Sequence, residues 1–224
     1  MRVLILGASG RTGKYILEAA LAKGYEVNCL VRNPKKFLAY QANAQVSIIE
    51  GTPASLDDLA RAAEDCEYLV SALNISRRSD FPWARLRTPK HFLSEVMQNI
   101  LKLAEAQKFQ KITICSAWGV NETFKEIPWW FQLLIKYSNI GVAYRDHERQ
   151  EALLDKTDYL NWTVVRPVGL INRGKMKELR LSFNNQPKPL LTVSRKEVGY
   201  FILDSLTQSE FDYKKPVLSS PLFS

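Results

Sequence analysis

The sequence predicts a protein of the α/β class, built on a doubly wound parallel sheet with a small lobe at the carboxyl end. Short apolar runs rich in β-branched residues alternate with amphipathic helical segments, and the connections between them are short. That alternation is typical of βαβ units, which give parallel sheets covered on both faces. The chain has 224 residues, of which 46% are hydrophobic and 24% charged. These values allow a sizeable core and exclude disordered and fibrous proteins.

Six strands and four helices are predicted before residue 168. The strands are continuous apolar runs, as expected for strands that are buried on both faces. They cover residues 3–6, 27–31, 46–49, 67–73, 111–115 and 162–165. The helices have apolar residues at spacings of three and four. They cover residues 11–23, 56–65, 89–107 and 143–156. Ser55 is placed to cap the second helix, and Gly24 to end the first.

A glycine-rich turn joins the first strand to the first helix. It reads Gly7-Ala8-Ser9-Gly10-Arg11-Thr12-Gly13. The first glycine allows a tight turn, the second lets the backbone approach a diphosphate, and the third lets the helix pack closely on the strand. Three glycines in this context predict an NAD(P)-binding Rossmann fold; the alternative is a structural turn without a ligand. A nucleotide-hydrolysing P-loop is excluded, because Ala8 and Tyr15 stand where it needs Gly and Ser or Thr.

A basic turn follows the second strand, where NAD-binding proteins usually place Asp or Glu to bind the ribose 2′-hydroxyl. This chain instead has Arg32, then Lys35 and Lys36. Arg32 can stack on adenine and pair with a 2′-phosphate, and Lys36 adds a second positive charge. The expected cofactor is therefore NADP(H) in preference to NAD(H). The alternative is a solvated basic turn that binds nothing.

Regular alternation fades after Pro167. Short strands are predicted at residues 179–183, 190–193 and 216–218, and a helix at 195–206. No stretch rich in Gly, Ser or Pro separates these elements from the rest of the chain. We therefore expect one domain over residues 1–224, with a dinucleotide-binding core at 1–167 and a small substrate lobe with a C-terminal strand at 168–224.

Metal, disulfide and membrane-spanning sites are not expected. Cys29, Cys66 and Cys115 are widely spaced and form no Cys-x-x-Cys pair, and His91 lies far from His147. Reduced thiols in a cytoplasmic protein are the simplest interpretation. The apolar stretches are too short to cross a bilayer, and the first residues do not have the form of a signal peptide.

The net charge of +8 is concentrated in three segments. Residues 32–36, 77–90 and 173–196 carry +3, +4 and +6, so the remainder of the chain is net −5. These segments are expected beside the cofactor site, and no nucleic-acid recognition module is present. We therefore expect a small anionic ligand and no nucleic-acid partner.

Six segments resemble those of a known family. They are GASGRTG, LVRNPKK, EYLVSALN, KITICSAWG, DHERQEALL and NWTVVRP. Over residues 1–167, and more loosely near Ser194, the chain resembles the atypical short-chain dehydrogenase/reductase superfamily, in particular its NmrA-like NAD(P)H-binding family. It is also similar to the biliverdin-IXβ/flavin reductase group. The resemblance implies a Rossmann oxidoreductase fold.

The resemblance also implies a set of cofactor-binding residues. They are Gly7, Ser9, Gly10, Arg11, Thr12, Gly13, Arg32, Lys36, Thr52, Leu73, Asn74, Ser116, Ala117, His147, Pro167 and Val168. Thr52 stands where the family commonly has Asp beside the adenine, which weakens one contact. By the same resemblance, Ser116 and Ala117 would lie on the nicotinamide side, and His147 near the nicotinamide ribose.

The chain departs from ordinary short-chain dehydrogenases in its proton chemistry. Those enzymes use a Tyr-x-x-x-Lys pair, but none of the nine tyrosines here has Lys four residues later. The flavin-reductase group has His after the sixth strand, where this chain has Gly169. Ser116 and His147 are the remaining catalytic candidates; the alternatives are a satisfied strand-end serine and a surface histidine.

Two further segments are unusual. Residues 127–137 contain Pro128-Trp129-Trp130-Phe131, for which we consider a wall or lid for a flat substrate, a homodimer face, a membrane-surface helix, or core under a long connection. Residues 75–90 hold five basic side chains after the fourth strand, at the sheet edge where ligands bind. These side chains would either steer an anionic substrate or only solvate the loop.

Taken together, these features favour an NADP(H)-dependent reductase of the atypical short-chain type. Hydride transfer to a flavin, a quinone-like molecule or another conjugated acceptor needs little proton assistance, so such a small-molecule substrate is favoured over a simple ketone. The alternative is a non-catalytic NADP(H) sensor that acts through a protein partner.

Overall fold

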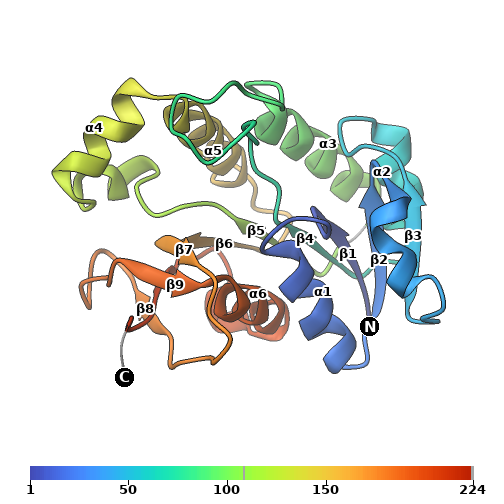
Figure 1. The fold of residues 1–224 in the computed structure, drawn as a ribbon. Coiled ribbons are helices and arrows are strands. Elements are labelled where there is room, and N and C mark those ends of the chain that lie inside the picture. Colours follow the sequence, from blue (N-terminus) through green and yellow to red (C-terminus); the bar gives the residue numbers. More distant parts are fainter. Residues whose placement is uncertain (108, 223–224) are drawn as a thin grey trace.

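The computed structural model describes residues 1–107 and 109–222, and its centre is an eight-stranded sheet (Figure 1). The sheet contains β1 (Arg2–Leu6), β2 (Glu26–Val31), β3 (Val46–Glu50), β4 (Tyr68–Ser71), β5 (Lys111–Cys115), β6 (Trp162–Pro167), β8 (Arg180–Ser182) and β10 (Val217–Ser219). Their order is β3-β2-β1-β4-β5-β6-β10-β8. The first six positions have the strand order of a Rossmann fold, which confirms the predicted class.

The sheet is not parallel throughout. All its pairings are parallel except that of β8, which runs antiparallel to β10 and forms the edge. A separate parallel pair joins β7 (Gly169–Ile171) to β9 (Thr192–Ser194). The predicted parallel sheet is confirmed, and the antiparallel direction of β8 at its edge is an addition that the sequence did not specify.

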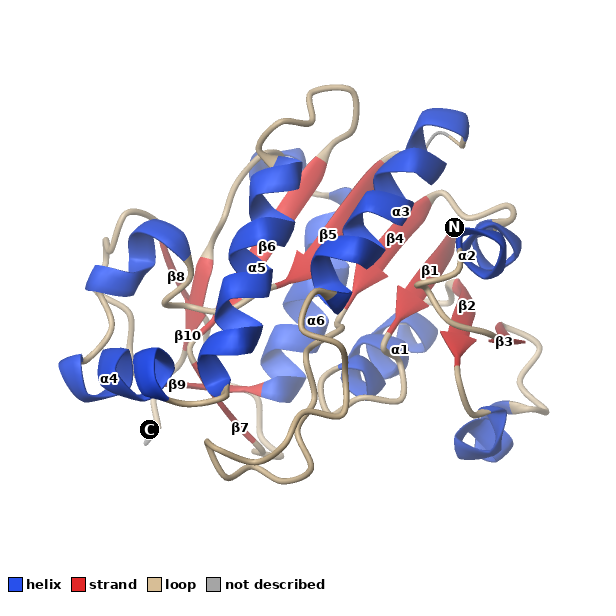
Figure 2. Ribbon diagram, turned by 90° about the horizontal axis from the view of Figure 1, so that it is seen from above, coloured by secondary structure: helices blue, strands red, loops and turns tan. Residues whose placement is uncertain are grey.

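Helices cover both faces of the sheet. α1 (Gly13–Ala22) and α6 (Arg195–Asp204) pack together on one face, and α2 (Leu56–Ala63), α3 (Phe92–Ala106) and α5 (Ile140–Leu154) cover the other. Figure 2 shows α3 and α5 side by side over the strands. Strand β1 shows the two-sided burial directly: Val3 and Ile5 belong to one core cluster, Leu4 and Leu6 to the other.

Several connections are short helices. They are η1 (Pro34–Tyr40), η2 (Asn121–Lys125), η3 (Ser205–Thr207) and η4 (Ser209–Phe211). A further helix, α4 (Trp129–Tyr137), packs against α5. None of the helices in the described part of the chain has the length and apolarity needed to cross a membrane.

Local signals place most helix ends as predicted. Ser55 Oγ accepts from the N–H of Asp58 at 3.2 Å and caps α2, and Gly24 follows the end of α1. Helix α3 begins at Phe92, three residues later than expected, because Asp146 of α5 caps it: its carboxylate accepts from the N–H of Leu93 at 2.7 Å and from Ser94 Oγ at 2.6 Å.

Three other elements differ from the predictions. A helix at residues 127–137 was only one of the alternatives considered, because α4 has just two clearly polar residues, Gln132 and Lys136, and so shows a weak helical period. Strand β6 continues to Pro167, whose carbonyl accepts from the N–H of Trp118 at 3.0 Å, although the prediction ended it at Val165. Strand β4 is shorter than residues 67–73, because Ala72 and Leu73 already turn away over Gly7.

The segment after residue 167 is joined to the rest of the protein. Strands β8 and β10 extend the main sheet, and α6 packs on α1. The backbone of Gly199 in α6 lies so close to α1 that a Cβ there would meet Tyr15 Cβ at 2.8 Å. The β7–β9 pair lies beside this layer (Figure 1).

Gly13 supports the turn between β1 and α1 by close approach. A Cβ at this position would lie 2.0 Å from the carbonyl oxygen of Gly7. We expect Gly13→Ala to lower the free energy of unfolding by about 1–3 kcal/mol, because the backbone must move apart to make room. Urea unfolding measures this.

Gly174→Ala is the matched control, since a Cβ at Gly174 would meet nothing within 4 Å. Equal stability of the two variants would contradict the close packing of the turn.

Candidate functional site

The glycine turn has the geometry of an anion-binding loop. Gly7 has φ +86°, and its carbonyl accepts from the N–H of Gly10 at 2.8 Å. The backbone N–H groups of Arg11 and Thr12 meet no acceptor within residues 1–107 and 109–222. Thr12 precedes the first helical residue but its side chain makes no cap. Free N–H donors at a helix N-terminus fit a diphosphate, so the residues present suit a dinucleotide.

An ion pair joins this turn to the basic loop of residues 75–90. Arg11 donates from Nη1 and Nη2 to the two carboxylate oxygens of Asp80, both at 3.0 Å. The Arg11 guanidinium lowers the pKa of Asp80, with smaller contributions from Arg77 and Arg195. Burial and the charge of Arg11 lower the pKa of Arg195. Three guanidinium groups therefore gather around one carboxylate, and an added anion would be stabilised there.

The predicted 2′-phosphate residues are free to bind a ligand. Arg32 and Lys36 are exposed beyond the end of β2, and Asn33 between them caps η1 by accepting from the N–H of Lys35. Thr52 is half-buried and its N–H donates to Asp58 Oδ2 at 3.0 Å. Asp58 of α2 therefore holds the backbone at position 52 in place.

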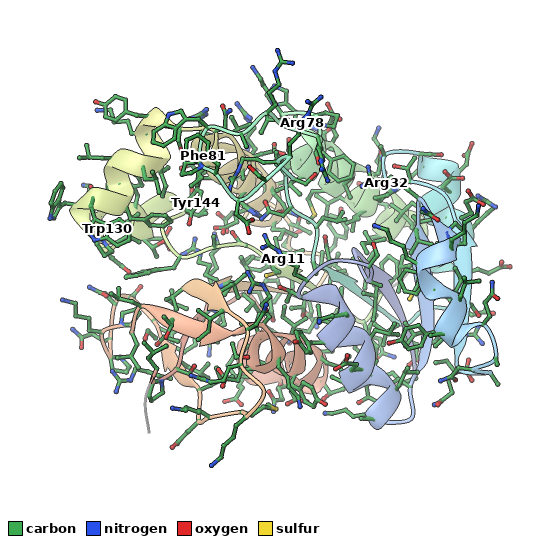
Figure 3. All side chains as sticks on the ribbon, viewed as in Figure 1. Arg11, Arg32, Arg78, Phe81, Trp130 and Tyr144 are labelled. Atoms are coloured by element: carbon green, nitrogen blue, oxygen red, sulfur yellow. The ribbon has the colours of Figure 1, made fainter. Side chains whose placement is uncertain are left out.

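A cavity of about 340 Å³ lies at the carboxyl ends of β4, β5 and β6. Its lining comprises Asn74, Arg77, Ser116, Ala117, Trp118, Pro128, Trp130, Phe131, Ile140, Ala143, Tyr144, His147, Pro167, Val168, Gly169, Leu170, Leu191 and Arg195. The lining is mostly apolar, with a few polar groups, as is usual for sites that hold small molecules. In Figure 3, Arg32 lies on the right, Arg11 near the centre and Trp130 on the left, so the cavity and the predicted 2′-phosphate site lie on opposite sides of the glycine turn.

Ser116, at the end of β5, is held by a buried charge network. Its Oγ donates to Glu151 Oε1 at 2.6 Å. Glu151 is fully buried on α5 and also binds Arg166 of β6, with Nε–Oε1 at 3.2 Å and Nη2–Oε2 at 2.5 Å. Arg166 also pairs with Glu122, and Lys215 lies 3.5 Å from Glu151. The hydroxyl proton of Ser116 is used in the hydrogen bond to Glu151. Its oxygen can therefore accept a hydrogen bond from a ligand in the cavity but cannot donate one.

The charge network sets the protonation of Glu151. Burial raises the pKa of Glu151, but the hydrogen bonds and charge of Arg166, with the bond from Ser116, outweigh it and lower that pKa below its ordinary value. Burial alone would lower the pKa of Arg166, but the hydrogen bonds and charges of Glu151 and Glu122 raise that pKa above its ordinary value. Both groups remain charged at neutral pH.

His147 is buried, at 3% exposure, and lines the cavity. The alternative, a surface histidine, is therefore wrong. Burial lowers the pKa of His147, so the ring is neutral at pH 7. Its Nδ1 lies 3.2 Å from the amide oxygen of Gln150, which can only accept, so Nδ1 carries the proton. Nε2 is then an acceptor, and the ring is a poor proton donor at neutral pH.

The structure brings six of the predicted residues together in the cavity. They are Asn74, Ser116, Ala117, His147, Pro167 and Val168. The glycine turn, Arg32, Lys36, Thr52 and Leu73 lie outside the cavity lining, along the ends of β1 to β4. This separation is what a dinucleotide spanning the sheet edge requires.

Sequence reasoning missed several lining residues. Tyr144 lies one helical turn before His147, a spacing that could have revealed it. Its hydroxyl donates to the carbonyl of Trp118 at 3.2 Å, and burial raises its pKa. Arg195 was expected near the site only as part of the basic segment 173–196, and the packing of α6 against β9 brings it to the cavity.

The interpretation of residues 127–137 can now be narrowed. Ile135 is buried, but Trp129, Trp130 and Tyr137 are exposed, so burial in the core is wrong for most of the segment. Trp130 and Phe131 line the cavity, as a wall would. Cys115, at the end of β5, is only partly buried. No cluster that could hold a metal ion occurs among the residues that the structure describes.

Comparison with known proteins agrees with this geometry. The model of a family described as NAD(P)H-binding matches residues 7–209. The chain is 50% identical over 221 residues to the photosystem II assembly factor Ycf39 of Cyanophora paradoxa, which covers 97% of this chain and 60% of that protein. The chain therefore spans about three fifths of the length of this relative.

Solved structures show the same fold at low identity. An anaerobilin reductase of Escherichia coli O157:H7, ChuY, superposes with a TM-score of 0.79 at 17% identity, over 100% of this chain and 99% of that one. A short-chain dehydrogenase/reductase of Veillonella parvula in complex with NADP gives 0.79 at 18% identity, over 99% and 95%. The superpositions confirm the Rossmann fold, and the match to the NAD(P)H-binding family model over residues 7–209 confirms the expected family.

The buried network predicts a specific pH dependence of stability. The folded-state pKa of Glu151 lies below its unfolded value near 4.5, so its contribution is present above that pH and is lost as pH falls through the folded pKa. Glu151→Gln leaves Arg166 without its buried partner and should cost about 3 kcal/mol at pH 7. Urea unfolding at pH 7 and pH 4 should show that the gap to wild type shrinks in acid.

Glu18→Gln on the exposed side of α1 is the matched control, and we expect it to change stability little at either pH. A Glu151→Gln variant that is as stable as Glu18→Gln at pH 7 would contradict the account of the network.

Proposed function

The chain belongs to the NAD(P)H-binding family, and on that premise we propose that it is a reductase that uses NADPH and passes a hydride to a flat, conjugated acceptor held in the cavity. The observation that carries this proposal is the position of the cavity. It lies at the carboxyl ends of β4 to β6, next to the glycine turn, where the nicotinamide end of a dinucleotide reaches in this strand order.

The residues at the sheet edge suggest how the cofactor is held. The N–H groups of Arg11 and Thr12 would bind the diphosphate, and Arg32 with Lys36 the 2′-phosphate. Ser116 Oγ donates its own hydrogen bond to Glu151, so it would accept a hydrogen bond from the nicotinamide carboxamide. His147 Nε2 would accept from a ribose hydroxyl.

The apolar lining suggests what the acceptor is. The bound nicotinamide supplies the hydride, and the protein supplies orientation and excludes water. Trp130, Phe131 and Tyr144 offer aromatic surface to a planar molecule. Neither Ser116 nor His147 has a proton to give, and the Tyr-x-x-x-Lys pair is absent from the sequence. An acceptor that spreads the incoming charge over a conjugated system, such as a flavin or quinone, suits these groups better than a simple ketone.

A second candidate is a non-catalytic role. The relative from Cyanophora paradoxa is named as an assembly factor, and the shortage of proton donors in the cavity also favours a protein that binds NADP(H) and acts through a partner. Oxidation of NADPH by an acceptor is expected of the reductase and not of the non-catalytic protein, so an assay of turnover distinguishes the two candidates. The cytoplasmic location stays a prediction.

Cofactor choice tests the basic turn after β2. We expect wild-type protein to bind NADPH more tightly than NADH, because Arg32 pairs with the 2′-phosphate. Arg32→Asp should weaken NADPH binding at least about ten-fold more than NADH binding, since it replaces an attraction by a repulsion. Calorimetry with each cofactor measures this.

Lys102→Asp is the matched control: it makes the same charge change at an exposed position of α3. Equal wild-type affinities for the two cofactors would show that the NADP(H) assignment is wrong.

The reductase proposal is tested by NADPH oxidation with a panel of flavins, quinones, aldehydes and simple ketones. We expect turnover with at least one conjugated acceptor and none with simple ketones. Ala143→Phe, which narrows the apolar cavity from α5, should lower turnover more than NADPH affinity, because the glycine turn and Arg32 lie outside the cavity lining. Tight NADPH binding without turnover of any acceptor would favour the non-catalytic candidate.

A further inference from the structure

Helix α4 is apolar on the side that faces away from the protein. Its inner side is anchored by Ile135, which is buried. On its outer side Trp129 is 73% exposed, Trp130 53%, Leu133 46% and Tyr137 63%. Apart from Gln132 and Lys136, every residue of α4 is aromatic or aliphatic, and side chains of this kind are normally covered. A cluster of this kind on a surface marks an interaction site.

The loop of residues 75–90 extends this surface beyond the end of α4. Trp83 Nε1 donates to the carbonyl of Tyr137 at 2.9 Å, and Asn139 Nδ2 donates to the carbonyl of Trp83 at 3.0 Å. The ring of Phe81, which is 61% exposed, lies 5.3 Å from that of Trp83. Figure 3 shows Phe81 and Trp130 on the same side of the molecule. We call the set Phe81, Trp83, Trp129, Trp130, Leu133 and Tyr137 the aromatic face.

Positive charge surrounds the aromatic face. Residues 76–90 and 125–138 together contain seven Lys and Arg residues and two acidic residues. Both carboxylates are already engaged: Asp80 binds Arg11, and Glu126 accepts from Trp118 Nε1 at 3.2 Å. The exposed cations Arg78, Arg85, Arg87, Lys90, Lys125 and Lys136 are therefore not balanced locally.

We propose that the aromatic face binds the surface of an anionic lipid bilayer. Trp and Tyr side chains favour the headgroup level of a membrane, where the ring is in an apolar layer and its polar atom in water. Lys and Arg around them attract anionic headgroups, and the two effects reinforce each other in peripheral binding. The combination of exposed aromatic rings with a rim of unbalanced cations fits this partner.

A second copy of the chain fits the face less well. A symmetric dimer would place the same patch on both subunits, so the two positive rims would face each other across the interface. Such like-charge contacts oppose association. The charge on the rim requires a negative partner, and a bilayer with anionic headgroups supplies one over the whole area of the face.

Membrane binding would also bring the cavity to the bilayer. Trp130 belongs to the aromatic face and also lines the cavity. Its neighbour Phe131 lines the cavity too. An apolar molecule dissolved in the membrane could enter the cavity next to these side chains. The lipid-binding proposal itself does not depend on the reductase function, because the aromatic face is defined by exposure and charge alone.

Co-sedimentation with vesicles tests the proposal. We expect the protein to sediment with phosphatidylglycerol vesicles at low salt and not with phosphatidylcholine vesicles, and added salt should weaken the binding. The Trp emission should shift to shorter wavelength on binding, because Trp83, Trp129 and Trp130 are exposed in the free protein. Trp118 and Trp162 are already buried.

A pair of variants locates the binding surface. Trp129→Ser/Leu133→Ser should weaken binding to phosphatidylglycerol vesicles at least ten-fold, while NADPH affinity stays at the wild-type value and shows that the protein is folded. Leu56→Ser is the control, because Leu56 is 41% exposed on α2, outside the aromatic face. It should leave vesicle binding unchanged.

Three results would overturn the proposal. One is the absence of binding to phosphatidylglycerol vesicles, and another is equal binding by Trp129→Ser/Leu133→Ser and wild type. The third is a dimer, seen by light scattering, that Trp129→Ser/Leu133→Ser dissociates, since this would assign the aromatic face to a second copy of the chain.

Discussion

The buried pair between Arg166 and Glu151 is the constraint on which the candidate site depends. Arg166 lies on β6 and Glu151 on α5, and both are almost completely withdrawn from solvent. Removing two charges from water costs free energy, which is recovered only if further hydrogen bonds complete the pair. Ser116, Asn121, Glu122 and Lys215 supply these bonds and contacts. The network therefore fixes α5, the end of β5 and the η2 segment relative to β6.

The same network determines what the site can do chemically. Ser116 Oγ donates its hydrogen bond to the Glu151 carboxylate, and burial keeps the His147 ring neutral with its N–H directed to Gln150. Ser116 Oγ and His147 Nε2 therefore face the cavity as acceptors, which can position a cofactor but cannot protonate a substrate. The apolar remainder of the lining favours a planar molecule. Position and exclusion of water, rather than acid catalysis, are the contributions that these residues can make.

Most of the fold could be predicted from the sequence because its signals are local. Strand β1, the glycine turn and the cap at Ser55 depend on residues that are adjacent in the chain. Helix α4 could not be distinguished from the other interpretations of its segment, because only Gln132 and Lys136 interrupt its apolar residues and the helical period is weak. The exposure of its outer side is a property of the assembled surface.

The site was predictable where strand ends mark it. Ser116 and Pro167 follow from the rule that ligands bind at the carboxyl ends of parallel strands. Other contributions depend on packing between elements about 50 residues or more apart in the chain. They include Arg195 in the cavity lining and Asp146 as the cap of α3. The burial of His147 has the same origin, because α3 covers the side of α5 that looks polar in sequence.

A crystal structure of the complex with NADP⁺ tests the central claim most directly. The account predicts that the diphosphate lies on the glycine turn and that the nicotinamide ring enters the cavity. The carboxamide should lie within hydrogen-bond distance of Ser116 Oγ, and the reactive ring carbon should face the space beside Trp130 and Phe131. A dinucleotide whose nicotinamide lies outside the cavity, with Ser116 free of contact, would contradict the account.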